Sequence, residues 1–155
     1  MKNSQTRWLA CVVALVLSTV TSAASSRGLM NEREIRLECG NEFFSMAEVR
    51  TCLDKKQAQS EVVLKRAEAQ ARKAITRWDE DDKYIDLAKT RLAVSGRAFA
   101  KYRTEHCAFA ASMGGGAIGN ALEMGRAACV AELNQRRAEQ LRLLVSELPP
   151  KQNTK

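Results

Sequence analysis

Four cysteines carry the most constrained chemistry in this sequence: Cys39, Cys52, Cys107 and Cys129. They can pair in three ways. We favour Cys39–Cys52, which would pin the N-terminal segment to the start of the first long helix, and Cys107–Cys129, which would close the glycine loop. Each loop is short, so each bond adds about 3 kcal/mol by loop-closure entropy. The alternative chemistry is zinc binding, which the spacing disfavours because the chain has no CxxC pair and one histidine. We therefore expect two disulfides, no metal and no other cofactor.

The single histidine, His106, is the natural candidate for acid–base catalysis. A catalytic dyad would need a nucleophile beside it, and Ser95 lies three helical turns away on the same stripe of residues. The alternative is a histidine at the edge of a helical core, with Arg103 and Glu105 pairing locally on the helix surface. This second interpretation fits better, so the sequence predicts a protein that is not an enzyme.

Two loop segments are candidate contact sites for a partner. The segment Met113–Asn120 reads MGGGAIGN, with Gly114, Gly115, Gly116 and Asn120 as the candidate residues. A phosphate-binding loop would continue with Gly-Lys-Ser/Thr, which this one lacks, so we expect a flexible turn that a protein partner can contact. The second segment is acidic, and its candidate residues are Asp79, Asp81 and Asp82. Acidic residues favour the start of a helix, so we expect a turn here followed by a helix.

Basic residues gather on the first long segment of helical pattern: Lys55, Lys56, Lys65, Arg66, Arg72, Lys73 and Arg77. The default interpretation is a solvated helix surface. Glu61 and Glu68 interrupt the basic run and stacking aromatics are lacking, so we expect no nucleic-acid partner. Weak contact with an anionic envelope polymer is the functional alternative.

The first 23 residues have the organisation of a secretory signal peptide. Lys2 and Arg7 precede an apolar run of 12 residues, Leu9–Val20, and small residues follow at positions 21–24. The run is shorter than the roughly 20 residues that span a bilayer, and Cys11 lies too early for a lipoprotein signal. We expect cleavage after Ala23 or Ala24, export to the periplasm or medium, and no transmembrane segment afterwards. Removing residues 1–23 leaves 132 residues and lowers the net charge from +7 to +5.

The rest of the chain must position these residues, and its composition favours helices. Residues 24–43 have the character of a polar leader into the fold. Ser45 and Glu48 form a capping-box pattern that predicts a helix starting near Met46, and Phe44 with Val49 occupy the positions of a hydrophobic staple. Apolar and small residues then recur at helical spacing as far as Trp78.

Two further helices follow. The second has the most regular period in the chain, and its predicted packing seam comprises Ile85, Ala88, Leu92, Ser95, Phe99, Tyr102, His106 and Phe109. The third is predicted from about Ile118 to Leu148, where Pro149-Pro150 stops it. Arg137 lies within its apolar stripe, either as a side chain reaching toward solvent or as half of an inter-helix ion pair. We expect an all-α, elongated, antiparallel three-helix bundle over residues 24–148, with a flexible tail at 149–155.

Several short motifs occur in order along this chain. They are Met46-x-x-x-x-x-Cys52, Phe99-Ala-Lys-Tyr102-Arg103-x-x-x-Cys107, Gly114-Gly115-Gly116, Cys129 and Arg137-Ala138-x-x-Leu141. Together they resemble the LprI-like lysozyme inhibitor domain over roughly Cys39 to Leu144. Two positions depart from the pattern, with Phe99 where tryptophan is usual and Thr104 where an acidic residue is usual.

The resemblance implies a small, exported, disulfide-bonded helical domain that blocks lysozyme by protein–protein contact. Many lysozymes are basic, as this chain is, so long-range attraction would not assist association. Contact would then need the acidic segment or insertion of the glycine segment. The alternative is a non-enzymatic adaptor or structural protein of the envelope that binds an anionic polymer or another periplasmic protein.

Overall fold

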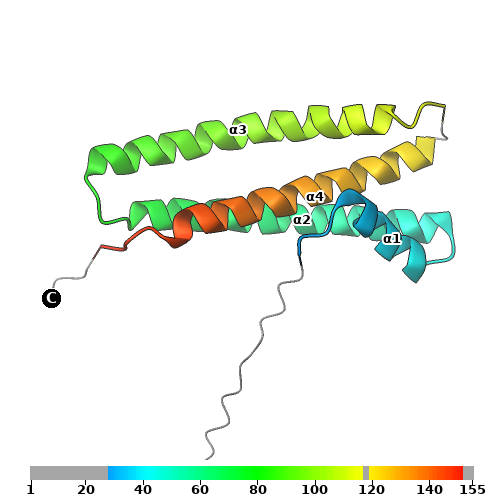
Figure 1. Cartoon of the computed structure of the whole chain (residues 1–155), viewed down its shortest axis with the longest axis horizontal. Helices are drawn as coiled ribbons and strands as arrows, with labels where there is room; N and C mark the ends of the chain where they lie inside the picture. Colours follow the sequence, from blue (N-terminus) through cyan, green and yellow to red (C-terminus); the bar gives the residue numbers. More distant parts are fainter. Residues whose placement is uncertain (1–27, 117–118, 152–155) are drawn as a thin grey trace, which may run out of the picture.

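The computed structural model describes residues 28–116 and 119–151, which form four helices. The helices are α1 (Glu32–Glu42), α2 (Met46–Thr76), α3 (Asp82–Ser112) and α4 (Gly119–Ser146). The three long helices run antiparallel to their neighbours in the chain and give an elongated bundle (Figure 1). The all-α prediction is confirmed, but the predicted number of three helices is wrong.

The additional helix, α1, lies within the segment predicted to be a polar leader. It begins with a capping box, in which the Asn31 side chain accepts from the Glu34 amide and the Glu34 carboxylate accepts from the Asn31 amide. Ile35 and Cys39, one turn apart, are its two buried side chains. The Glu132 carboxylate of α4 accepts a hydrogen bond from the first amide of α1 at 2.8 Å, where a negative charge is favourable. A cap, two buried positions and a neighbouring carboxylate thus hold a helix of 11 residues.

The predicted start of α2 is confirmed. The Ser45 hydroxyl accepts from the Glu48 amide at 3.3 Å, and the Glu48 carboxylate accepts from the Ser45 amide at 3.2 Å. The staple is different from the prediction, because Phe44 is fully exposed and Phe43 instead packs with Val49 against the core. The turn after α2 and the end of α3 before the glycines also lie where they were predicted. Ile118, the predicted start of the last helix, lies outside the described residues.

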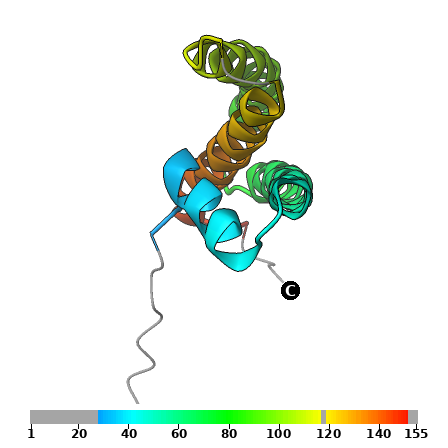
Figure 2. The same cartoon turned by 90° about the vertical axis from the view of Figure 1, so that its right-hand side faces the viewer.

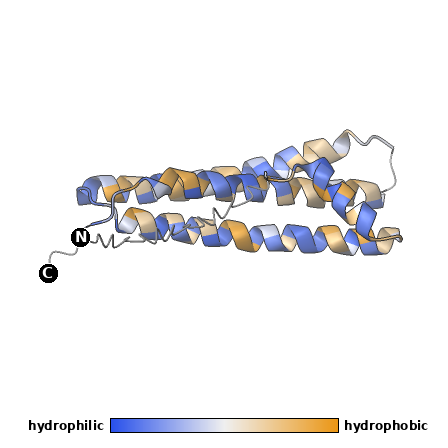
Figure 3. Ribbon diagram, turned by 60° about the horizontal axis from the view of Figure 1, so that its bottom comes forward, coloured by the Kyte–Doolittle hydropathy of each residue, from blue (hydrophilic) through white to orange (hydrophobic). Residues whose placement is uncertain are grey.

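The helices α2 and α4 form the tightest pair. Alanines allow their backbones to approach closely, and Ala67, Ala71 and Ala138 are completely buried between Leu64 and Leu141. A second cluster joins α1 to the first turns of α2 and to α4 through Ile35, Leu53, Met124 and their neighbours. Seen along the bundle, α4 lies between α3 on one side and α1 with α2 on the other (Figure 2). Hydrophobic and hydrophilic residues alternate along every long helix (Figure 3), and no helix of the described part is long and apolar enough to cross a membrane.

The helix α3 packs less closely, with Ile85 and Cys107 as its two buried residues. It therefore leaves two grooves. The charged cleft, between α2 and α3, has a volume of about 560 Å³ and is lined by Glu61, Lys65, Glu68, Arg72, Arg97 and neighbouring residues. The apolar groove has a volume of about 410 Å³ and lies among α2, α3 and α4. It is closer to the turn between α2 and α3, residues 79–82, which we call the acidic turn.

Candidate functional site

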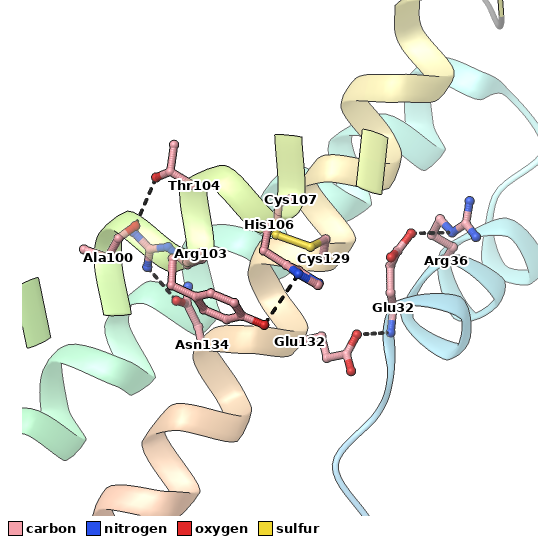
Figure 4. The surroundings of a disulfide bond; sticks show 11 residues. Glu32, Arg36, Ala100, Arg103, Thr104, His106, Cys107, Cys129, Glu132 and Asn134 are labelled. Atoms are coloured by element: carbon pink, nitrogen blue, oxygen red, sulfur yellow. Dashed lines mark hydrogen bonds and ion pairs between the residues drawn. A yellow bond between two sulfur atoms is a disulfide. The ribbon is translucent and has the colours of Figure 1, made fainter. Parts of the chain in front are cut away.

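Two disulfides join neighbouring helices, one between α1 and α2 and one between α3 and α4. Cys39 of α1 is bonded to Cys52 of α2, with 5.8 Å between their Cα atoms. Cys107 of α3 is bonded to Cys129 of α4, with 5.7 Å between their Cα atoms (Figure 4). This pairing is the predicted one. The second bond closes the helical hairpin that carries the glycine loop, so the loop is held between two covalently joined helices.

A chain of hydrogen bonds crosses three helices beside the second disulfide. Arg103 of α3 donates from Nη1 to Oδ1 of Asn134 on α4 at 2.6 Å (Figure 4). Nδ2 of Asn134 donates to the Ser60 hydroxyl of α2 at 2.9 Å, and that hydroxyl donates to the Gln57 carbonyl at 2.6 Å. Asn134 is 0% exposed and Ser60 1% exposed. Sequence reasoning missed Asn134, although a polar residue between Val130 and Leu141 on the buried face of α4 was the available signal.

Phe99 lies between two arginines. The guanidinium carbon atoms of Arg103 and Arg137 are each 5.8 Å from its ring centroid. Arg137 also donates from Nη2 to the Ser95 hydroxyl at 2.5 Å. The alternative that Arg137 forms an inter-helix ion pair is therefore wrong among the described residues. Arg137 instead forms a hydrogen bond to Ser95 and contacts the ring of Phe99. Phe99 and Arg103 of α3 thus contact α4, and Phe99 packs against the cluster that contains the buried Leu141. The motif residues therefore stabilise the packing of α3 against α4.

The predicted seam of α3 is correct as far as Phe99 and wrong after it. Tyr102, His106 and Phe109 are exposed, and Arg103 and Cys107 face α4 instead. A pattern that repeats every 3.5 residues drifts by about 20° per heptad on a straight helix, so the inward face moves to the next position. The Tyr102 hydroxyl lies 3.5 Å from Nδ1 of His106 at the surface.

His106 and Ser95 cannot form a catalytic dyad. They are separated by about 16 Å along the axis of α3 at 1.5 Å per residue. The Ser95 hydroxyl is also bound to Arg137. No group of three or more metal-ligating side chains occurs among residues 28–116 and 119–151.

The two predicted contact segments lie at opposite ends of the bundle (Figure 1). The 31 residues of α3 separate them, a distance of about 46 Å. Gly114, Gly115 and Gly116 are exposed, and Gly115 has a positive φ of 58° that favours glycine. Asn120 accepts from Nη1 of Arg50 at 3.2 Å, which ties the start of α4 to the first turns of α2.

Large apolar side chains are exposed at the glycine end of the bundle. Phe44 is fully exposed and Met46 61% exposed at the α1–α2 connection, while Phe109 is 64% exposed and Met113 72% exposed at the end of α3. Both connections lie at the same end of the molecule (Figure 1), on opposite sides of α4 (Figure 2). Each connection therefore exposes two large apolar side chains at this end, and exposed apolar side chains can mark a protein-binding surface. We call these four residues with Gly114–Gly116 the glycine-loop end.

The acidic turn at the other end is partly neutralised. Lys83 lies 3.8 Å from the Asp81 carboxylate, and Lys151 lies 3.8 Å from the Asp82 carboxylate. Backbone hydrogen bonds also hold the start of the predicted tail, because Asp79 donates to Pro149 at 2.8 Å and Lys151 donates to Arg77 at 2.7 Å. The carboxylates are solvent-exposed but already have cationic neighbours within the chain.

Comparison with known protein families gives a match over most of the described chain. The family model described as "Lysozyme inhibitor LprI" matches residues 39–141, which include both disulfides, the motif around Phe99, the acidic turn and the glycine loop. No curated protein and no solved structure gives a significant match. Because the family model covers about two thirds of the chain, this protein belongs to the LprI lysozyme inhibitor family.

Proposed function

We propose that this protein is an exported, non-enzymatic inhibitor that binds lysozyme through its glycine-loop end. The observation that carries the proposal is the exposure of large apolar side chains at one end of the bundle, on a member of a lysozyme inhibitor family: Phe109 and Met113 before the glycine loop, and Phe44 and Met46 at the α1–α2 connection. Apolar and aromatic side chains at the centre of an interface supply most of its binding energy.

The shape of this end suits a cleft. Lysozymes cleave their polymer between two carboxyl groups in a groove, so an inhibitor must fill that groove or block it. The glycines carry no side chains that would widen the end of the α3–α4 hairpin. The Cys107–Cys129 bond fixes the hairpin beforehand, which lowers the entropy lost on binding. Arg50, at the same end, lies beside Asn120, and the Asp54 carboxylate at 3.9 Å partly balances its charge.

The acidic turn is the second candidate contact. Its carboxylates complement a basic lysozyme, which is the argument in its favour. Lys83 and Lys151 already reduce its net charge, and about 46 Å separate it from the glycine-loop end. A single compact interface therefore uses one end or the other, and a variant at each end distinguishes them.

Export is part of the proposal. Two disulfides persist in an oxidising compartment, and the leader at residues 1–23, which lies outside the described residues, has the pattern of a signal peptide.

The test is lysis of a peptidoglycan suspension by lysozyme with increasing amounts of the oxidised protein. We expect dose-dependent protection that Phe109→Ser weakens. Leu87→Ser is the matched control, because Leu87 is a similarly exposed apolar residue near the opposite end of α3. Protection unchanged by Phe109→Ser but lost on neutralising Asp79 and Asp82 would move the site to the acidic turn. No protection against several lysozyme classes would refute inhibition and favour the adaptor alternative.

A further inference from the structure

The apolar groove has the dimensions and lining of a ligand site. Its volume of about 410 Å³ lies within the range of roughly 300–1,000 Å³ that is typical of small-molecule pockets. Leu92 of α3, Ile75 of α2 and Leu141 of α4 contribute to its walls. Leu144 also lines it and is 70% exposed, so a ligand in the groove would remove apolar surface from water.

Two arginines without a carboxylate partner line this groove, Arg137 at its Ser95 end and Arg91 farther along α3. Arg137 and Arg91 both line it, and neither forms an ion pair within residues 28–116 and 119–151. Arg137 donates to the neutral hydroxyl of Ser95, while its buried Nε has no hydrogen-bond partner. A guanidinium that is half-buried beside apolar side chains favours an anionic partner, because a neutral hydroxyl does not balance its charge.

The two ends of the groove differ. From Arg137 to Leu148 the groove follows α4 for about 16 Å. Trp78 and Leu148 line the far end, next to the acidic turn, which would repel an anion. The groove therefore fits a ligand with an anionic head at Arg137 and an apolar chain that extends toward Trp78.

We propose that the apolar groove binds a medium-chain fatty acid, whose length matches the groove. The carboxylate lies against Arg137 and Arg91, and the acyl chain covers Leu92, Leu141 and Leu144. This site is separate from the glycine-loop end, and its occupation does not depend on binding to lysozyme. A fatty acid fits better than a neutral lipid because both arginines lack a carboxylate partner within the chain that the structure describes.

Trp78 gives a direct assay. The full chain has two tryptophans, Trp8 and Trp78, so Trp8→Phe leaves a single reporter in the groove. Titration with laurate below its micelle concentration should change Trp78 fluorescence with a saturating, one-site curve. Dodecyltrimethylammonium, with the same chain length and the opposite charge, should bind at least about tenfold more weakly.

Variants in the same Trp8→Phe chain locate the site. Arg137→Gln should weaken laurate binding about tenfold, the effect of losing a charge-assisted hydrogen bond. The exposed Arg91→Gln should weaken it about threefold. Ala88→Phe should abolish binding by filling the groove. Arg97→Gln is the matched control, because this exposed arginine of α3 lines the charged cleft instead and should leave binding unchanged.

Three results would overturn the proposal. One is an unchanged Trp78 signal at all laurate concentrations below the micelle concentration. Another is equal affinity for laurate and dodecyltrimethylammonium, because the arginines would then not select the head. The third is an equal loss of affinity in Arg91→Gln and Arg97→Gln, which would indicate general charge attraction. Arg91→Gln keeps the test decisive if Arg137→Gln or Ala88→Phe does not fold.

Discussion

Replacing Asn134 with alanine tests whether the buried hydrogen-bond chain fixes the bundle. The substitution removes the acceptor of Arg103 and the donor to Ser60. A hydrogen bond to a charged group contributes about 1.5–3 kcal/mol and a neutral one about 0.5–1.5 kcal/mol. Ser60 keeps its bond to the Gln57 carbonyl, and the half-buried Arg103 can regain some water. We therefore expect Asn134→Ala to lower the free energy of unfolding by about 2–4 kcal/mol.

The measurement is equilibrium unfolding of the oxidised protein in urea, with the midpoint compared at constant slope. Asn120→Ala is the matched control, because Asn120 accepts the same type of arginine bond at an exposed position. Its expected loss is below about 0.5 kcal/mol. Arg103→Ala and the double variant with Asn134→Ala complete a cycle, with an expected coupling of at least about 1 kcal/mol. A loss as small as that of Asn120→Ala, or additive effects in the cycle, would refute this reasoning.

Three further predictions concern the same fold. Phe99→Ala should lower stability by about 2 kcal/mol through lost burial and arginine contact, while Phe99→Trp should stay within about 1 kcal/mol; thermal unfolding compares them. The double substitution Cys107→Ser and Cys129→Ser should lower the free energy of unfolding by about 3 kcal/mol. Equal unfolding midpoints of the variant and the oxidised protein would contradict this prediction. The hydrogen bonds from the Ser45 side chain and backbone lower the pKa of Glu48. The Glu48 carboxylate therefore stabilises the folded protein above the ordinary pKa of a glutamate, and this stabilisation is lost as the pH falls through the lowered pKa. Glu48→Gln should accordingly reduce the free energy of unfolding more at about pH 7 than at about pH 3.

Local signals in the sequence were sufficient for the ends of the long helices. Ser45 and Glu48 have the spacing of a capping box, and the structure forms it. The same type of signal, Asn31 with Glu34, marks α1, but the largely polar surface of this short helix is also typical of a polar leader. Its stability comes from contacts with α4 and from the Cys39–Cys52 bond, which are not evident in a window of neighbouring residues.

The contacts between helices were harder to predict from the sequence than the ends of the helices. The inward face of α3 moves from Phe99 to Arg103 and Cys107, because a straight helix does not follow a 3.5-residue repeat. The partner of Arg103, Asn134, lies 31 positions away on another helix. The exposed apolar side chains of the glycine-loop end also depend on the fold, which brings the α1–α2 and α3–α4 connections to the same end of the bundle. Periodicity predicts faces of single helices, whereas these features depend on how the helices are arranged.

The weak attachment of α3 has a consequence for local opening of the protein. The bond to Cys129 fixes α3 near its C-terminal end, while one buried residue, Ile85, anchors its N-terminal half. Amide protons from Asp82 to about Phe99 should therefore exchange with solvent through partial unfolding around a covalent pivot, and those of α2 and α4 through global unfolding. We therefore expect the first half of α3, which forms one wall of the apolar groove, to be the least stable cooperative unit among the long helices.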